Sequence, residues 1–254
     1  MTSATRSKQG LVYVPLTDNG PMAHAEVGRT VRIQGRGPPW IAVDHEVSSV
    51  VVARWPGRLW SVEIVDAVTP QDGAPRLSAD AGYTRAAAVR ILRAVPVSTL
   101  FGTSGVGVCA VIEAAAALTP AQAKGLSEGR HRDAGDAQTR LWQRWLVREN
   151  IPLDRYKDLD GTLAIGASKA GSPIGQAPRV IHGEVGRRAE KFAGPSVWLV
   201  DDADPEGAFL AEPWCAASTS LLDAALAFGA PDLVGKHDRD ILAAAWLAII
   251  GWPP

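Results

Sequence analysis

Cys215 is the side chain whose position in this sequence best fits nucleophilic chemistry. It lies in EPWCAAS (Glu212 to Ser218), at the start of a predicted helix that ends near Gly229. Unpaired amides and the helix dipole at such a position stabilise a thiolate and lower the pKa of the thiol. Cys215 is therefore a candidate catalytic nucleophile. The alternative is a buried structural cysteine.

The residues around Cys215 extend this hypothesis. The stretch Pro213 to Cys215, followed by small residues, resembles the start of the catalytic helix in CHAP-type and related cell-wall amidases and endopeptidases. The resemblance implies a cysteine hydrolase or transferase in which a histidine serves as the base. His237 or His182 would take that role, with Asp201 or Asp202 orienting the imidazole.

A glycine-rich stretch raises the question of phosphate binding. Gly102 and Gly107 have the G-x-x-x-x-G spacing of a nucleotide-binding P-loop, with Gly105 between them, but Val108 and Cys109 replace the Lys and Ser/Thr that hold phosphate and magnesium. The stretch is not a catalytic P-loop. It is either a degenerate nucleotide-binding loop or a set of glycines that allow close packing of helices.

The acidic and histidine residues predict no metal centre. One acidic run has the 1, 3, 5, 6 spacing of a calcium loop, formed by Asp202, Asp204, Glu206 and Gly207. Its twelfth position is Pro213, where a bidentate Glu is needed. None of the five histidines lies in a metal-binding motif. We therefore expect no metal and no cofactor.

Nine tryptophans are many for this length. Trp55 and Trp60 flank a Pro56-Gly57 turn, where they are not easily assigned to a core. Trp is enriched at protein interfaces, because its large ring buries area while its N–H reaches water. We predict that these two residues bind a protein partner or mediate self-association.

Composition and charge restrict the partners and the compartment. The 254 residues carry 26 basic and 27 acidic side chains, a formal net charge of −1, so no global field favours nucleic acid or a membrane surface. Two cysteines in no paired spacing fit a reducing compartment. No signal-peptide pattern is found at the start. We expect a cytoplasmic, bacterial-type protein.

The first part of the chain is predicted to be rich in strands. We assign residues 1–10 to a flexible tail and 11–70 to a β-rich subdomain. Val31 to Gly35 and Ser48 to Val68 are rich in β-formers, and the second run contains the Pro-Gly turn of a predicted hairpin. Beyond the turn, Trp60, Val62 and Ile64 alternate with other residues to give one apolar face.

The remainder, residues 80–254, is predicted to be a mainly helical domain after a Pro- and Gly-rich boundary at 69–82. Its expected helices are 83–95, one capped by Thr119, 136–150, about 186–192, one that ends at Gly229 and one that ends at Gly251. Short strands are expected at 179–185 and 196–200, and a long loop at 160–178. The fold class is α+β, an N-terminal hairpin or small sheet packed on a larger helical part with two short strands.

Three functions follow from these observations. The first is a non-catalytic binding or regulatory protein, because no catalytic motif is complete. The second is a hydrolase or transferase that depends on Cys215. The third is a degenerate nucleotide binder at 102–107.

Overall fold

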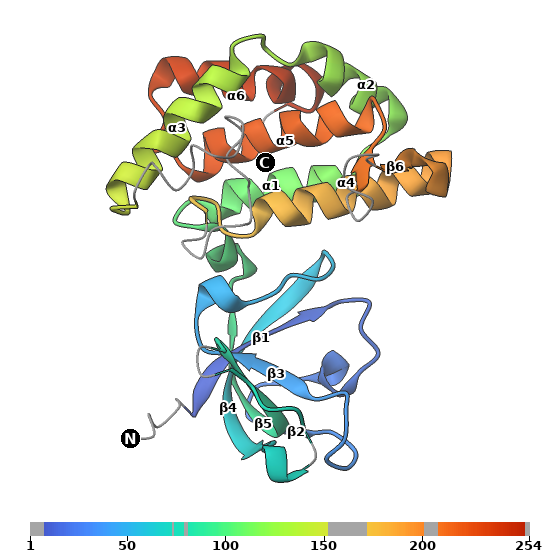
Figure 1. Cartoon of the computed structure of the whole chain (residues 1–254), viewed down its shortest axis with the longest axis vertical. Helices are drawn as coiled ribbons and strands as arrows, with labels where there is room; N and C mark the ends of the chain where they lie inside the picture. The colour runs from blue at the N-terminus through green and yellow to red at the C-terminus, as the bar shows by residue number, and fades with distance from the viewer. Residues whose placement is uncertain (1–7, 73, 79–80, 152–171, 201–207, 252–254) are drawn as a thin grey trace. The chain divides into compact units, whose positions relative to one another are not determined.

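The chain forms two compact units, Met1–Leu100 and Phe101–Pro254. The computed structural model describes residues 8–72, 74–78, 81–151, 172–200 and 208–251. The first unit contains an antiparallel sheet and the second is mainly helical, which confirms the α+β class (Figure 1). The structure places the division after Leu100, whereas the sequence analysis places it in the loop at 69–82.

The N-terminal unit is a small closed barrel. Four strands pair in a ring in the order β1–β4–β5–β3 and back to β1, and β2 pairs with β5 beside β3. The strands are β1 (Gln9–Pro15), β2 (Thr30–Arg32), β3 (Ile41–Asp44), β4 (Gly57–Ala67) and β5 (Tyr83–Val95). β1 begins at Gln9, so the last residues of the expected tail belong to the barrel, and residues 1–7 lie outside the described chain.

The helix predicted at 83–95 is wrong, because this segment is strand β5. Ala86, Ala87 and Ala88 favour a helix in isolation, yet all three are buried in the sheet between β4 on one edge and β2 or β3 on the other. Pairing along both edges outweighs the small propensity of alanine for a helix. Arg90 and Arg93 remain on the exposed face.

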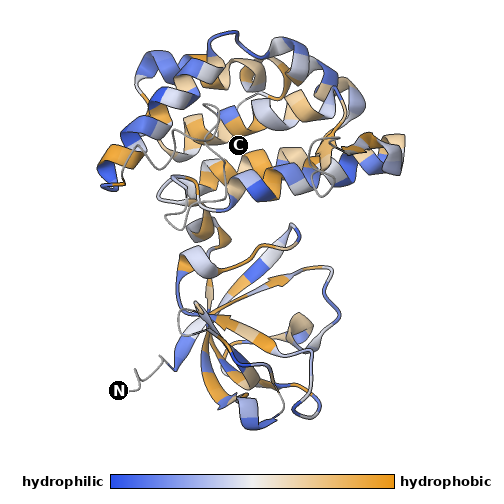
Figure 2. Cartoon of the chain, in the orientation of Figure 1, coloured by the Kyte–Doolittle hydropathy of each residue, from blue (hydrophilic) through white to orange (hydrophobic). Residues whose placement is uncertain are grey.

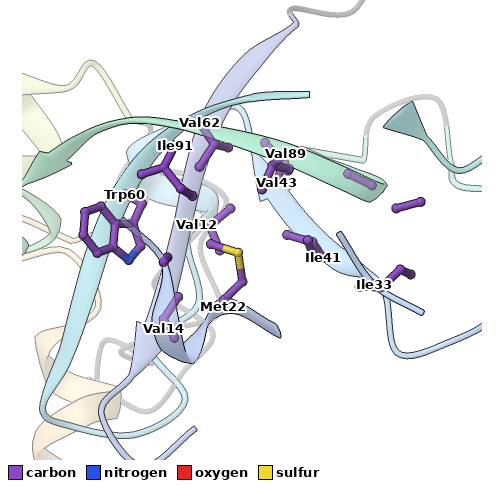
Figure 3. Close-up of a cluster of buried hydrophobic side chains, with 13 residues drawn as sticks. Val12, Val14, Met22, Ile33, Ile41, Val43, Trp60, Val62, Val89 and Ile91 are labelled. Carbon is purple, nitrogen blue, oxygen red and sulfur yellow. The ribbon is translucent and has the colours of Figure 1, made fainter. Parts of the chain in front are cut away.

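The barrel interior is apolar and includes the face predicted on β4. Trp60 and Val62 are buried in the core cluster (Figure 3). Ile64 is partly buried and packs against this cluster, which confirms the predicted alternation. The predicted hairpin is wrong, because residues 50–56 form no strand and β4 pairs with β1 and β5 instead. The core also contains Val12, Val14, Met22, Ile33, Ile41, Val43, Val89 and Ile91.

The C-terminal unit is built around one buried helix. α5 contacts each of the other α-helices in the described part of the unit, and most of its residues are buried (Figures 1 and 2). The helices are α1 (Gly105–Ala117), α2 (Pro120–Gly129), α3 (Ala134–Arg148), α4 (Ala177–Ala193), α5 (Trp214–Gly229) and α6 (Lys236–Ile249). A two-stranded sheet, β6 (Trp198–Val200) and β7 (Ala208–Leu210), completes the described part.

Local sequence signals place several of these helices correctly. Thr119 caps α2 in a complete capping box with Gln122, as predicted. Gly251 follows α6 with a φ of 95°, a conformation that favours glycine. The strand predicted at 179–185 is wrong, because α4 contains it. Most of the loop predicted at 160–178 lies outside the described residues.

Two buried carboxylates join helices in this unit. Asp238 of α6 accepts hydrogen bonds from Arg140 of α3, at 2.7 Å from Nη2, and forms an ion pair with Arg144. Asp223 of α5 accepts a hydrogen bond from Arg130 Nε at 2.7 Å. Burial raises the pKa of Asp223 to about 6, although Arg130 opposes the shift.

None of the helices in the described residues combines the length and the apolar character that crossing a membrane requires.

Gly10 provides a test of barrel closure. A Cβ at this position would lie 2.4 Å from the carbonyl oxygen of Asp44, where β1 meets β3. Gly10→Ala should lower the free energy of unfolding by about 1–3 kcal/mol, measured by urea denaturation. Gly37→Ala is the matched control, since a Cβ there meets nothing within 4 Å. Equal effects of the two variants would contradict the closure.

Asp223 predicts a pH dependence of stability. Its folded pKa of about 6 exceeds the ordinary value, so the folded state binds the proton more readily, and this contribution is lost as the pH rises through 6. Relative to Asp223→Asn, the wild type should gain on the order of 2 kcal/mol in unfolding free energy between pH 7.5 and 4.5. A constant difference across this range would show that Asp223 ionises normally.

Candidate functional site

The N-terminal unit contains a cleft of about 620 Å³ at one end of the barrel. Its walls are the last residues of β4, the connection to β5, the start of β5 and Lys8. β4 is irregular here, since its register against β5 shifts between Ile64 and Ala67. Such bulges bend a strand and redirect its side chains. The volume is that of a small-molecule site.

The lining combines an apolar wall with three cations. The apolar residues are Ile64, Val65, Ala67, Val68, Pro70, Ala74, Pro75 and Leu77. Lys8, Arg76 and Arg85 supply positive charge, and none of the described lining residues is acidic. An organic anion with an apolar body has the complementary chemistry.

Arg85 is the most firmly positioned of the three cations. Its guanidinium lies 5.0 Å from the ring centroid of Trp40 and 6.0 Å from that of Tyr83, and Nη1 donates a hydrogen bond to the Pro75 carbonyl at 2.5 Å. These contacts leave further N–H groups on Arg85, and no carboxylate in the described chain forms an ion pair with it. A held guanidinium of this kind is suited to an anion.

Two described acidic side chains that lie close to the lining residues in sequence are paired elsewhere. Asp66 forms ion pairs with Arg32 at 3.1 Å and Arg36 at 2.7 Å. Asp72 accepts hydrogen bonds from Thr69 and from Arg36, and these partners hold the pKa of Asp72 below its usual range. Both acids therefore have cationic partners other than Lys8, Arg76 and Arg85.

A polar chain of contacts lies behind the cleft wall. Thr84 lines the cleft and is 8% exposed. Its hydroxyl lies 2.8 Å from Nε2 of His45, and Nδ1 of the same ring lies 3.3 Å from the Gln9 carbonyl oxygen. Residues from three strands or strand ends thus meet at this point of the barrel.

Cys215 does not have the environment of an activated nucleophile. It lies in the first turn of α5, as predicted, but burial and then the charge of Glu212 raise the pKa of its thiol. The predicted lowering of this pKa is therefore wrong. The helix N-terminus cannot offset the lost hydration and the adjacent carboxylate.

The histidines predicted to assist Cys215 lie apart from it. His237 is near the start of α6, at the opposite end of α5, and fourteen residues of helix separate the two ends by about 20 Å. His182 packs against Trp198, with ring centroids 5.7 Å apart, and desolvation lowers the pKa of its imidazole. No hydrogen bond joins either histidine to Cys215 in the described chain. Asp201 and Asp202 lie outside the described residues.

The glycines of the predicted phosphate-binding loop lie in close packing contacts. The residues before it form a 3-10 helix, Val97–Phe101, in place of the strand that precedes a phosphate loop. Gly102 has a φ of 87°, and a Cβ there would meet the Pro173 carbonyl at 2.6 Å. Gly107 faces Phe228 of α5, and Gly105 is buried at the start of α1. These contacts are those expected if the glycines allow close packing of helices.

The two tryptophans predicted to bind a partner have different environments. Trp60 is 8% exposed and belongs to the barrel core, so it is unavailable to a partner. Trp55 is half-buried, and its role in an interface stays a prediction.

Within the described ranges no three His, Cys, Asp or Glu side chains gather as a metal site would require. The calcium-like residues Asp202, Asp204, Glu206 and Gly207 are outside these ranges.

Sequence reasoning missed the cleft. Lys8, Arg76 and Arg85 follow no motif, and Thr84 and His45 are 39 positions apart. The sequence predicts a helix at 83–95, and a helix would direct the Arg85 side chain differently from a strand. The available signal was the Pro- and Gly-rich connection at 69–82.

Comparison of the chain with protein-family models, curated proteins and solved structures found no match in any of the three.

The raised pKa of both cysteines predicts low reactivity. Burial and Glu113 raise the pKa of Cys109 to about 11, and Cys215 is shifted in the same direction. In the folded protein, alkylation by iodoacetamide should be slow at pH 6–7 at both positions and should increase only above about pH 9. Peptide mass mapping with urea-unfolded protein as the control measures this. Rapid reaction of Cys215 at pH 6 would instead support the hydrolase hypothesis.

Proposed function

We propose that this protein is a non-catalytic binding protein whose ligand is an organic anion with an apolar body, bound in the cleft of the N-terminal unit. The observation that carries the proposal is the cleft's lining, which joins an apolar wall to Lys8, Arg76 and Arg85, with no acidic side chain among the described lining residues. A ligand of this kind would be stabilised both by Coulomb attraction to the three cations and by burial of its apolar body against the wall.

The distribution of charge in the sequence supports an anion. Residues 1–100 carry eleven Lys or Arg and eight Asp or Glu, whereas the rest of the chain is net negative. The unit that contains the cleft therefore has a positive field of its own. A protein partner or self-association, and a cytoplasmic location, stay predictions.

Octane-1-sulfonate is a suitable probe, because its charge is constant with pH and its tail is apolar. Isothermal titration calorimetry on the full chain should show binding, and octan-1-ol, with the same tail and no charge, should bind more weakly. Arg85→Gln should weaken sulfonate binding about tenfold. Arg76→Glu, at an exposed position, should weaken it in a variant whose folding is not at issue.

The matched control is Arg90→Gln, which changes an exposed arginine of the same strand that pairs with Glu63 away from the cleft. This variant should bind as the wild type does. Unchanged affinity in both Arg85→Gln and Arg76→Glu would exclude the cleft as the site.

A further inference from the structure

His45 has a defined partner at each ring nitrogen. The Gln9 carbonyl lies 3.3 Å from Nδ1, and the Thr84 hydroxyl lies 2.8 Å from Nε2. A carbonyl oxygen can only accept a hydrogen bond, so Nδ1 carries a hydrogen. In the neutral ring Nε2 then has the lone pair, and the Thr84 hydroxyl must donate to it.

This assignment determines what Thr84 presents to the cleft. While its hydrogen is directed at His45, the hydroxyl oxygen offers only lone pairs to a ligand, which disfavours an anion. A second proton on the ring reverses the hydrogen bond, because Nε2–H then donates to the hydroxyl oxygen. The hydroxyl hydrogen becomes free to point into the cleft that Thr84 lines.

We infer that Thr84 is a ligand-binding residue of the cleft, and that protonation of His45 turns its hydroxyl into a donor for the bound anion. The inference rests on the proposed function and adds a residue that would contact the bound anion. Histidine is the side chain that most readily changes charge between pH 5 and 8. Binding should therefore become tighter on acidification.

Other charged groups surround His45 and need their own controls. Asp44 and Glu46 flank it in the chain, Lys8 adjoins Gln9, and Tyr83 and Arg85 adjoin Thr84. Burial raises the pKa of Asp44 to about 6, so this carboxyl changes charge within the pH range of the test below. Its protonation would also remove a negative charge from this end of the barrel.

The test is the affinity of the full chain for octane-1-sulfonate at pH 8.0 and pH 5.5, measured by calorimetry at one ionic strength. The wild type should bind about five times more tightly at pH 5.5, the effect of one additional hydrogen bond. His45→Gln and Thr84→Val should each give an affinity that does not change with pH. Thr84→Ser, which keeps the hydroxyl, and Asp44→Asn should retain the dependence.

The possible outcomes distinguish failure of this inference from failure of the proposed function. A pH dependence that persists in His45→Gln and Thr84→Val would overturn the inference, and so would one that is lost in Asp44→Asn alone. Binding that depends on Arg85 but not on pH would contradict the role of His45 and leave the proposed function intact. Absence of binding at both pH values would contradict both.

Discussion

The pairing of β5 with three other strands is the constraint on which the N-terminal unit depends. Its thirteen residues pair with β4 along one edge and with β2 and β3 along the other, so that the ring of strands closes. The same pairing fixes the start of β5. Thr84 and Arg85 are held there between the end of β4, the connection before β5 and Lys8. Closure of the barrel and construction of the cleft are thus consequences of one strand.

The sequence predicted correctly the features of the fold that depend on local signals. The alternation on β4, the capping box at Thr119 and the glycine after α6 depend on residues close together in the chain. β5 was mistaken for a helix because its alanines and its apolar spacing satisfy a helical period. Its strand conformation comes from partners 19 to 60 positions away, which a local window does not contain.

The site hypotheses from the sequence likewise depend on contacts that a local window does not contain. Cys215 was chosen from its position in a helix, but its pKa depends on burial and on Glu212, and its distance from His237 depends on the length of α5. The glycines at 102–107 were chosen by spacing, but their contacts are with Pro173 and Phe228. In the cleft, by contrast, each residue is unremarkable in sequence and acquires a role only from its neighbours in space.

The central claim is that the cleft binds an organic anion. Hydrogen exchange of the full chain, mapped by mass spectrometry with and without saturating octane-1-sulfonate, tests it most directly. The account predicts slower exchange in peptides that cover residues 64–70 and 84–85, because a ligand there restricts local opening. Protection confined to the helices of residues 101–254, or no protection anywhere, would contradict it.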